Sequence, residues 1–229
     1  MATNKVNKVN APVLSDYSIT NYIAAQNKVL SYLEMLKSDF KAKYDNDIVS
    51  FFQYRIKDNE SLINKLQRDK LPITEEAAMK NLNDIVGLRI VCPNLLYVQI
   101  IIELLKKSTT FKIINEKDYI SHPKDSGYRS YHLIVEVPVD LVDGLKVIRV
   151  EIQIRTLLMH AWSNFEHDKC YKKDIVDQEL HDSLKQRSDL LFDMDLDMMS
   201  QLVNERKSID GEMTSVNEYI HKLIRGKSQ

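Results

Sequence analysis

The sequence predicts an α+β protein: a sheet flanked by helices, with a long helix towards each end of the chain. Residues 147–155 alternate strictly between apolar and polar side chains, which is the period of a half-buried strand. Stretches on either side instead repeat their apolar residues every three or four positions, as amphipathic helices do. The 229 residues suit one sizeable domain with appendages, or two small ones.

Composition places the chain among ordinary globular proteins. Hydrophobic residues make up 44% and charged residues 28%. The formal net charge of −1 provides no general attraction to nucleic acid or membrane, so an anion site must come from locally gathered Lys and Arg. Cys92 and Cys170 form neither a disulfide framework nor a zinc motif. With no signal-peptide pattern and no run of 18 apolar residues, we expect a soluble, cytoplasmic protein without a membrane partner.

The first part of the chain predicts a flexible polar N-terminus, residues 1–14, followed by a long amphipathic helix. Ser15 or Asp16 is its expected cap, and apolar residues continue at helical spacing to Tyr44. Another apolar group, residues 48–54, leads into a basic segment in which a helix is expected after Lys57. Three polar positions of that helix share one side, which alone favours a solvated basic face: Ser61, Lys65 and Arg68.

A buried strand is expected at residues 83–92, after a short helix capped by Thr74. Asp84 lies at its mouth, and Gly87 would allow a close backbone approach. Arg89 lies inside this apolar strand, where an unpaired charge is costly, so it must meet a carboxylate or a ligand. Residues 95–107 then predict a helix, and residues 111–114 begin another strand.

Residues 117–132 form a loop-like segment with three tyrosines, two histidines, two lysines and an arginine. Loops often carry binding residues, and aromatic rings beside cations suit a base stacked above phosphates. Residues 133–139 then alternate as a strand, and Asp143-Gly144 gives a turn into 147–155. We therefore expect a hairpin that brings His132 and Glu151 to a common end.

The C-terminal part predicts helices. Residues 157–170 form one, with Trp162 and Phe165 towards the core, and apolar residues continue at helical spacing over 177–223. One straight helix over that stretch would span roughly 70 Å, so we expect a break near residues 208–211. A stripe this long is more typical of packing or a subunit interface than of a cofactor site. We expect 176–229 to be an oligomerisation extension, and the protein to be a homotetramer.

The polar groups together indicate phosphoryl-group chemistry. Such reactions need cations for a polyphosphate, carboxylates for Mg²⁺ and a base for the attacking hydroxyl. Asp84 and Glu151 suffice as metal ligands, because Mg²⁺ takes one or two carboxylates plus substrate phosphate. The chain has neither a G-x-x-x-x-G-K-[ST] nor a G-x-G-x-x-G motif. The residues alone therefore indicate a magnesium-dependent enzyme that acts on a nucleotide.

Several motifs, in order and at similar spacing, resemble the synthetase domain of RelA/SpoT proteins over about residues 45–175. They are Arg55-x-Lys57-x₃-Ser61-x₃-Lys65, Asp84 to Arg89, Lys117-Asp118-Tyr119, Pro123-Lys124-x₂-Gly127-Tyr128-Arg129-Ser130-x-His132 and Glu151-Ile-Gln153-Ile-Arg155. With no hydrolase or regulatory domain beside them, the chain looks like a stand-alone small alarmone synthetase of the RelQ or RelP type. The resemblance implies a nucleotidyltransferase-like synthetase fold over residues 15–175, built on a mixed, mostly antiparallel five-stranded sheet.

The resemblance also implies a GTP pyrophosphokinase of the stringent response. Such an enzyme moves the β,γ-diphosphate of ATP to the 3′-hydroxyl of GTP or GDP, giving pppGpp or ppGpp and AMP. Asp84 and Glu151 would bind Mg²⁺, and Glu151 would take the hydroxyl proton. ATP would meet Arg55 and Arg89 at adenine, and Lys57, Ser61, Lys65 and Arg68 at the phosphates. The acceptor would meet Lys117, Lys124, Tyr128 stacked on guanine, His132 and Gln153.

Some questions stay open in the sequence. Ser126 stands where the family often has Asn, which leaves the preference among GTP, GDP and GMP undecided, and Asn115 replaces an Arg of bifunctional relatives. Arg149 and Arg155 suit ion pairs as well as phosphate contacts. The alternatives are a pyrophosphate-releasing nucleotidyltransferase and a catalytically silent regulator that binds guanine nucleotides or single-stranded RNA. Asp84 and Glu151 favour catalysis, while regulation by product or RNA is left open.

Overall fold

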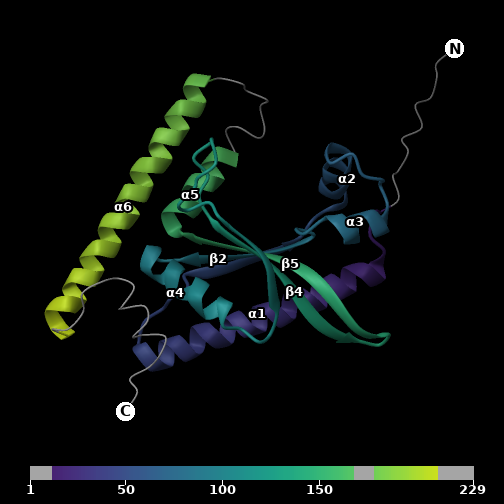
Figure 1. The fold of residues 1–229 in the computed structure, drawn as a ribbon, viewed down its shortest axis with the longest axis horizontal. Helices are drawn as coiled ribbons and strands as arrows, with labels where there is room; N and C mark the ends of the chain where they lie inside the picture. Colours follow the sequence, from purple (N-terminus) through teal and green to yellow (C-terminus); the bar gives the residue numbers. More distant parts are fainter. Residues whose placement is uncertain (1–11, 168–177, 211–229) are drawn as a thin grey trace.

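The computed structural model describes residues 12–167 and 178–210, with one mixed sheet in the order β1-β2-β5-β4-β3 (Figure 1). Only β2 and β5 are parallel, and the other three pairs are antiparallel. The predicted mixed, mostly antiparallel five-stranded sheet is therefore confirmed. Its strands are β1 Phe51–Ile56, β2 Val86–Cys92, β3 Lys112–Asp118, β4 Tyr131–Leu141 and β5 Gly144–Thr156.

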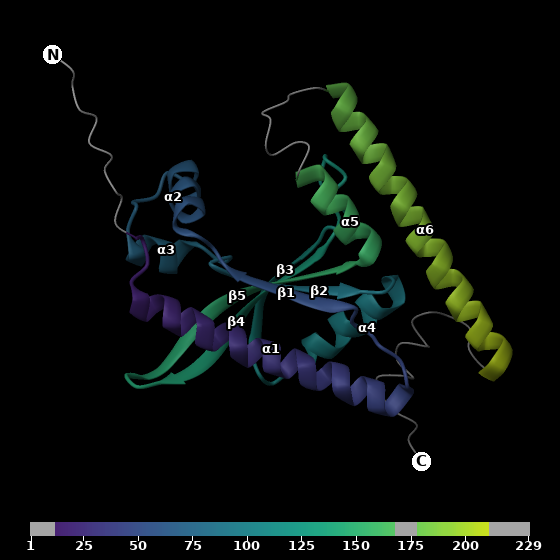
Figure 2. The same ribbon diagram turned by 180° about the vertical axis from the view of Figure 1, so that it is seen from behind.

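Six helices surround the sheet in the described residues: α1 Asp16–Tyr44, α2 Asn59–Arg68, α3 Glu75–Asn81, α4 Leu95–Lys106, α5 Leu157–Glu166 and α6 Gln178–Asp210. Helix α1 begins at the predicted cap, because the Ser15 side chain accepts a hydrogen bond from the backbone N–H of Ser18. Figures 1 and 2 show α1 and α4 on one side of the sheet, and α2 and α5 apart from each other on the opposite side.

The alternation of β5 divides the sheet into an apolar and a polar face. Val150, Ile152 and Ile154 are fully buried in the core that α1 and α4 cover. Glu151 and Gln153 face the other way, because neighbouring residues of a strand point to opposite sides. This polar face opens between α2 and α5.

Strand β1 is not anticipated by the sequence, which suggests a lead-in to a helix. Residues 51–56 instead pair antiparallel with β2, placing Gln53 opposite Arg89 and Arg55 opposite Gly87. Strand β1 lies at the edge of the sheet, and its residues 53–55 are exposed, so it lacks the apolar alternation of a half-buried strand. The pairing brings Gln53 and Arg55 onto the polar face.

The described C-terminal region is helical, with two departures from expectation. Trp162 is buried as predicted, but Phe165 is 40% exposed, and Met159 takes the second buried position on α5. Helix α6 runs unbroken to Asp210, so the expected break lies at the limit of the described residues and 211–223 lie outside them. None of the described helices is long and apolar enough to cross a membrane.

Candidate active site

Two adjacent rows of side chains cross the polar face, one residue from each strand. Hydrogen-bonded pairing aligns the first row as Gln53, Arg89, Gln153, His132 and Lys117, from β1 to β3. The register sets this convergence, because a slip of one residue would turn the members of a strand to the core face.

Each member of the second row lies two residues along its strand from its counterpart in the first row. The second row aligns Arg55, Gly87, Glu151, Ile134 and Asn115. The expected meeting of His132 and Glu151 is confirmed, because β4 and β5 form the predicted hairpin and the two side chains hydrogen-bond.

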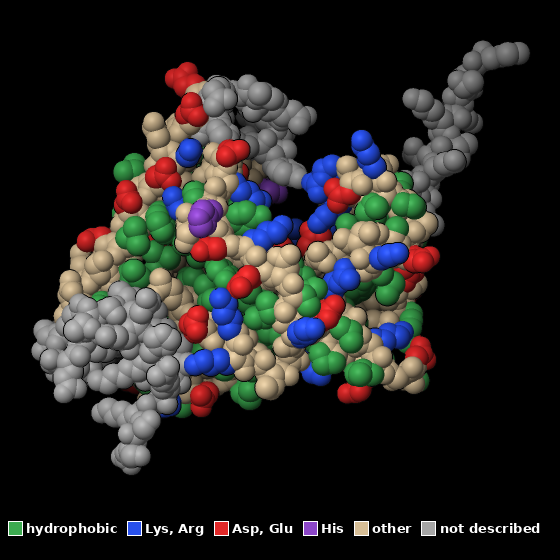
Figure 3. Space-filling model, in the orientation of Figure 1, with side chains coloured by type: hydrophobic (Ala, Val, Ile, Leu, Met, Phe, Trp, Pro, Cys, Tyr) green, Lys and Arg blue, Asp and Glu red, His purple; other side chains and the backbone are tan. Residues whose placement is uncertain are grey.

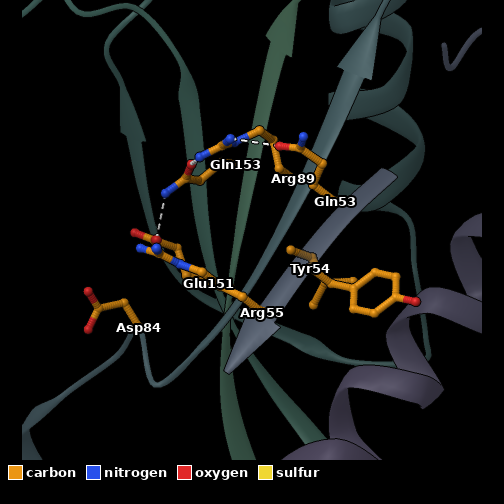
Figure 4. Close-up of a pocket in the computed structure, with 9 residues that line it drawn as sticks. Gln53, Tyr54, Arg55, Asp84, Arg89, Glu151 and Gln153 are labelled. Carbon is orange, nitrogen blue, oxygen red and sulfur yellow. Dashed lines mark hydrogen bonds between the residues drawn. The ribbon is translucent and has the colours of Figure 1, made fainter. Parts of the chain in front are cut away.

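Two pockets open on this face and share a wall. The first has a volume of about 440 Å³, and its lining includes Arg55, Gly87 and Arg89 (Figure 4). The second has a volume of about 290 Å³, and its lining includes Lys65, Lys117, Tyr119, Lys124 and His132. Asp84 and Glu151 line both pockets. Two ligands placed in these pockets would therefore meet at the two carboxylates.

Asp84 is held by two lysines. Lys57 Nζ and Lys65 Nζ lie 2.6 Å from its two carboxylate oxygens. Partial burial acts to raise the pKa of Asp84, but the hydrogen bonds from both lysines outweigh it and lower the pKa below its ordinary value. In Figure 3, Lys and Arg side chains gather at the notch beside α2, the local concentration that a nearly neutral chain needs for binding anions.

Glu151 belongs to a closed ring of hydrogen bonds. Its Oε1 lies 3.2 Å from His132 Nδ1, and its Oε2 accepts from Gln153 Nε2 at 2.8 Å. Tyr128 Oη lies 2.9 Å from His132 Nε2, and Arg155 Nη2 donates to both Tyr128 Oη and Gln153 Oε1. Because Arg155 can only donate, the Tyr128 oxygen accepts from it and the Tyr128 O–H can donate to His132 Nε2, which leaves His132 Nδ1–H to donate to Glu151.

The ring keeps Glu151 ionised. Burial and the nearby Asp84 act to raise the pKa of its carboxyl group, but His132 and Gln153 outweigh them and lower it. A carboxylate with both oxygens held in place suits a general base.

Two arginines of the polar face, Arg89 and Arg155, are partly or wholly buried and have no carboxylate partner among the described residues. Arg89 donates to Gln53 Oε1 at 2.8 Å, and burial lowers its pKa. Arg155 is fully buried; burial lowers its pKa to about 10, and its Nε and Nη1 have no hydrogen-bond partner among the described residues. Neither of the ion pairs considered for Arg149 and Arg155 forms in the described residues, since their partners there are neutral groups.

An aromatic cluster borders the second pocket. The Tyr119 ring meets those of Tyr128 and His132 edge to face, at centroid distances of 6.1 and 5.1 Å. Lys124 Nζ lies 4.7 Å from the centroid of Tyr128 and 5.0 Å from that of Tyr119. A cation over two aromatic rings can meet both a nucleobase and a phosphate.

Most of the predicted site residues converge, and three lie elsewhere than expected. Ser61 lies in the first turn of α2, where its hydroxyl donates to the capping residue Asp58, and Arg68 is exposed and pairs with Asp69. Neither lines the two pockets. Lys57 and Tyr128 also line neither pocket, but each contacts a predicted site residue that does, Lys57 through Asp84 and Tyr128 through His132. Gln153, expected at the acceptor, lines the first pocket with Arg55 and Arg89.

Sequence reasoning missed Gln53, which holds Arg89. It named Tyr119 and Arg155 within the motifs but did not predict that Tyr119 lines the second pocket or that Arg155 closes the ring around Glu151. Gln53 lies two residues before Arg55, so recognising β1 as a strand would have placed both on one face.

The carboxylates fit magnesium by chemical type. Among residues 12–167 and 178–210, no three His, Cys, Asp or Glu side chains are grouped to hold a metal ion. Two carboxylates are nevertheless the protein share of many Mg²⁺ sites, where substrate phosphate and water complete the shell. Asp84 and Glu151 match that donor set.

The fold and site define an α+β protein with two adjoining pockets that meet at paired carboxylates. The region found in RelA/SpoT proteins matches residues 54–176. The chain belongs to the RelA/SpoT family.

Its relatives include small members of that family. The GTP pyrophosphokinase YjbM of Bacillus subtilis is 31% identical over 208 residues, covering 91% of this chain and 94% of the relative. The GTP pyrophosphokinase YwaC of the same organism is 33% identical over 166 residues, covering 72% and 79%.

Two solved structures extend the likeness to the fold. The small alarmone synthetase 1 of Bacillus subtilis bound to its product pppGpp superposes with a TM-score of 0.76 at 31% identity, covering 83% of this chain and 96% of that one. The small alarmone synthetase 2 of Bacillus subtilis gives a TM-score of 0.74 at 29% identity, covering 82% and 97%.

Proposed function

We propose that this protein is a GTP pyrophosphokinase that transfers the β,γ-diphosphate of ATP to the 3′-hydroxyl of GTP or GDP. The main support for this reaction is that Asp84 and Glu151 line both pockets and so form a wall between them. A transfer between two bound nucleotides needs such a meeting point, because the attacking and leaving oxygens must lie nearly in line. Family membership and relatives named GTP pyrophosphokinase support the same reaction.

ATP is assigned to the first pocket. Arg55 and Arg89 line it from β1 and β2, where two guanidinium groups can stack on adenine. Lys57 and Lys65 form ion pairs with Asp84 at the shared wall, and their ammonium groups can turn to the β- and γ-phosphates when ATP binds. Ser61 and Arg68 reach neither pocket in this structure, so they are the weaker candidates for phosphate contacts.

The acceptor nucleotide is assigned to the second pocket. Lys117 and Lys124 line this pocket and supply cations for its phosphates. Tyr119 lines it too, and the ring of Tyr128, 6.1 Å from that of Tyr119, lies behind it and adds to the aromatic surface for guanine. His132 binds both Tyr128 and Glu151, so it couples the guanine surface to the base.

Glu151 acts as the general base. Its lowered pKa leaves it ionised at neutral pH, ready to accept the proton of the 3′-hydroxyl. His132 and Gln153 hold its two oxygens during the transfer. Mg²⁺, held by Asp84 and Glu151 with the substrate phosphates, would neutralise charge on the transferred group.

The experiment is a reaction of purified protein with ATP, GTP or GDP, and magnesium, separated by anion exchange. We expect AMP and a guanosine penta- or tetraphosphate in equal amounts. Pyrophosphate release would indicate the rival nucleotidyltransferase, and no turnover would indicate a silent binding protein. Initial rates with GTP, GDP and GMP would establish the acceptor preference.

We also propose that residues 176–229 assemble the protein into a cytoplasmic homotetramer. Helix α6 exposes apolar side chains along its length, among them Leu190 at 64% and Met194 at 56%. Exposed apolar residues in a long stripe favour a subunit interface. A monomer mass by light scattering at micromolar concentration would refute the tetramer.

A further inference from the structure

Helix α6 holds the loop that carries Tyr128, from the side away from the sheet. Ser188 Oγ on α6 donates a hydrogen bond to the carbonyl of Gly127. Gly127 has a φ of +85°, and a Cβ placed there would lie 2.8 Å from Ser188 Cβ and 3.1 Å from Lys185 Cα. The backbone of the loop therefore packs directly against the helix, at a contact that no other residue type could make without displacement.

Arg129 makes the second attachment. It is only 9% exposed, its Nη2 lies 2.8 Å from Asp189 Oδ1, and its guanidinium lies 4.1 Å from the centroid of the Phe192 ring. Nη1 of the same side chain donates to the carbonyl of Ile120 at the start of the loop. Arg129 thus ties both arms of the loop to two residues of α6.

These attachments flank Tyr128 on both sides in sequence. The backbone N–H of Lys124 donates to the carbonyl of Tyr128, so the two residues move together. Their side chains stack on each other beside the second pocket, while Gly127 and Arg129 contact α6. Any displacement of α6 would shift the aromatic and cationic groups assigned to the acceptor.

We propose that α6 is a positioning element for the acceptor nucleotide, with Arg129 and Asp189 as its positioning residues. This inference rests on the proposed function, because it concerns the acceptor pocket of that reaction. Neither residue lines the two pockets, so the effect passes through the backbone of residues 127–129. Loss of the Arg129–Asp189 contact weakens acceptor binding and leaves the ATP pocket, formed by β1, β2 and β5, unchanged.

The test compares Asp189→Ala with Asp193→Ala in the full-length protein. Asp193 is an exposed acid on the same helix, so both variants lose one negative charge and gain the same helix propensity. Asp189→Ala should raise the KM for GDP about tenfold, the effect of losing one charge-assisted hydrogen bond, and leave the KM for ATP unchanged. Asp193→Ala should match wild type. Asp189→Asn keeps an acceptor for Arg129 and should restore most of the affinity.

Hydrogen exchange of peptides covering residues 119–130 gives a readout that needs no turnover. Exchange should be faster in Asp189→Ala than in Asp193→Ala or wild type. Equal changes in the KM for ATP and GDP, or an unchanged KM for GDP, would overturn the inference, as would unchanged exchange. If wild type makes no product, the proposed function fails separately, and the dissociation constant of GDP by calorimetry takes the place of KM with the same expected ratio.

Discussion

Replacement of Glu151 by Gln isolates the proposed base, because it removes the charge and keeps the shape. The wild-type carboxylate accepts one hydrogen bond from His132 and one from Gln153. An amide keeps one accepting oxygen, which can stay with Gln153, while its NH₂ faces His132. The His132 ring can shift its proton to Nε2, and Nδ1 then accepts from that NH₂. The closed ring of hydrogen bonds can therefore form again around Gln at position 151, at little cost in free energy.

The expected stability change is small. At most one hydrogen bond is lost, worth about 1 kcal/mol, and removal of a buried charge beside Asp84 offsets part of it. The midpoint of thermal unfolding should move by no more than about 2–4 °C. Turnover should fall about 100- to 10,000-fold, because a positioned base contributes that much to rate.

The assay measures initial rates with ATP and GDP, alongside thermal unfolding by circular dichroism. The matched control is Glu136→Gln, a half-buried glutamate of β4 that lines neither of the two pockets. It should keep wild-type rates. A folded Glu151→Gln protein that retained more than about a tenth of wild-type turnover would refute the assignment of Glu151 as the general base, since loss of a positioned base should cost more than that in rate.

Three further outcomes are expected. In Gly87→Val the new side chain fits without a clash, because nothing lies within 4 Å of a Cβ at this position, but it fills part of the first pocket. The KM for ATP should therefore rise at least about tenfold, while the KM for GDP and the melting midpoint stay near wild type. Arg155→Met should keep the free energy of unfolding within about 1–2 kcal/mol of the wild-type value, since a buried guanidinium with two unpaired nitrogens contributes little to stability. It should lower turnover at least about tenfold, because Tyr128 loses the hydrogen bond from Arg155. A large loss of stability would contradict this. Burial raises the pKa of Asp195 from 3.8 to about 6, so this group contributes stability that is present near pH 4 and is lost as pH rises to about 6. Asp195→Asn should remove that contribution, so the difference in stability between wild type and variant should change between about pH 4 and about pH 6 in pH-dependent melts. A difference that stays constant over that range would exclude the titration of Asp195.

The sequence predicted the parts of the site that depend on strand alternation. Glu151 and Gln153 share one face because the residues that alternate with them, Val150, Ile152 and Ile154, are buried on the other, and that pattern is visible without a structure. The hairpin that brings His132 to Glu151 could also be predicted from the sequence, since a turn sequence separates two alternating segments.

The remaining parts depend on tertiary contacts that local patterns do not encode. Ser61 and Arg68 share a side of α2, but burial of Leu62 and Leu66 sets how that helix is turned, and this directs Lys65 rather than Arg68 to the site. Arg155 lies on the expected face, yet its partner Tyr128 is 27 residues earlier and meets it only through the fold. Sequence spacing therefore gave faces, and packing decided which residues of a face reach the pockets.

Transfer between the two pockets can be followed directly by tracing label from ATP into the products, in parallel reactions labelled at the α- or the γ-phosphorus. If the two pockets bring ATP and the acceptor together at Asp84 and Glu151, the γ-label will appear in the guanosine product and the α-label in AMP. Label from the α-position in the guanosine product, with the γ-label in free pyrophosphate, would contradict the account.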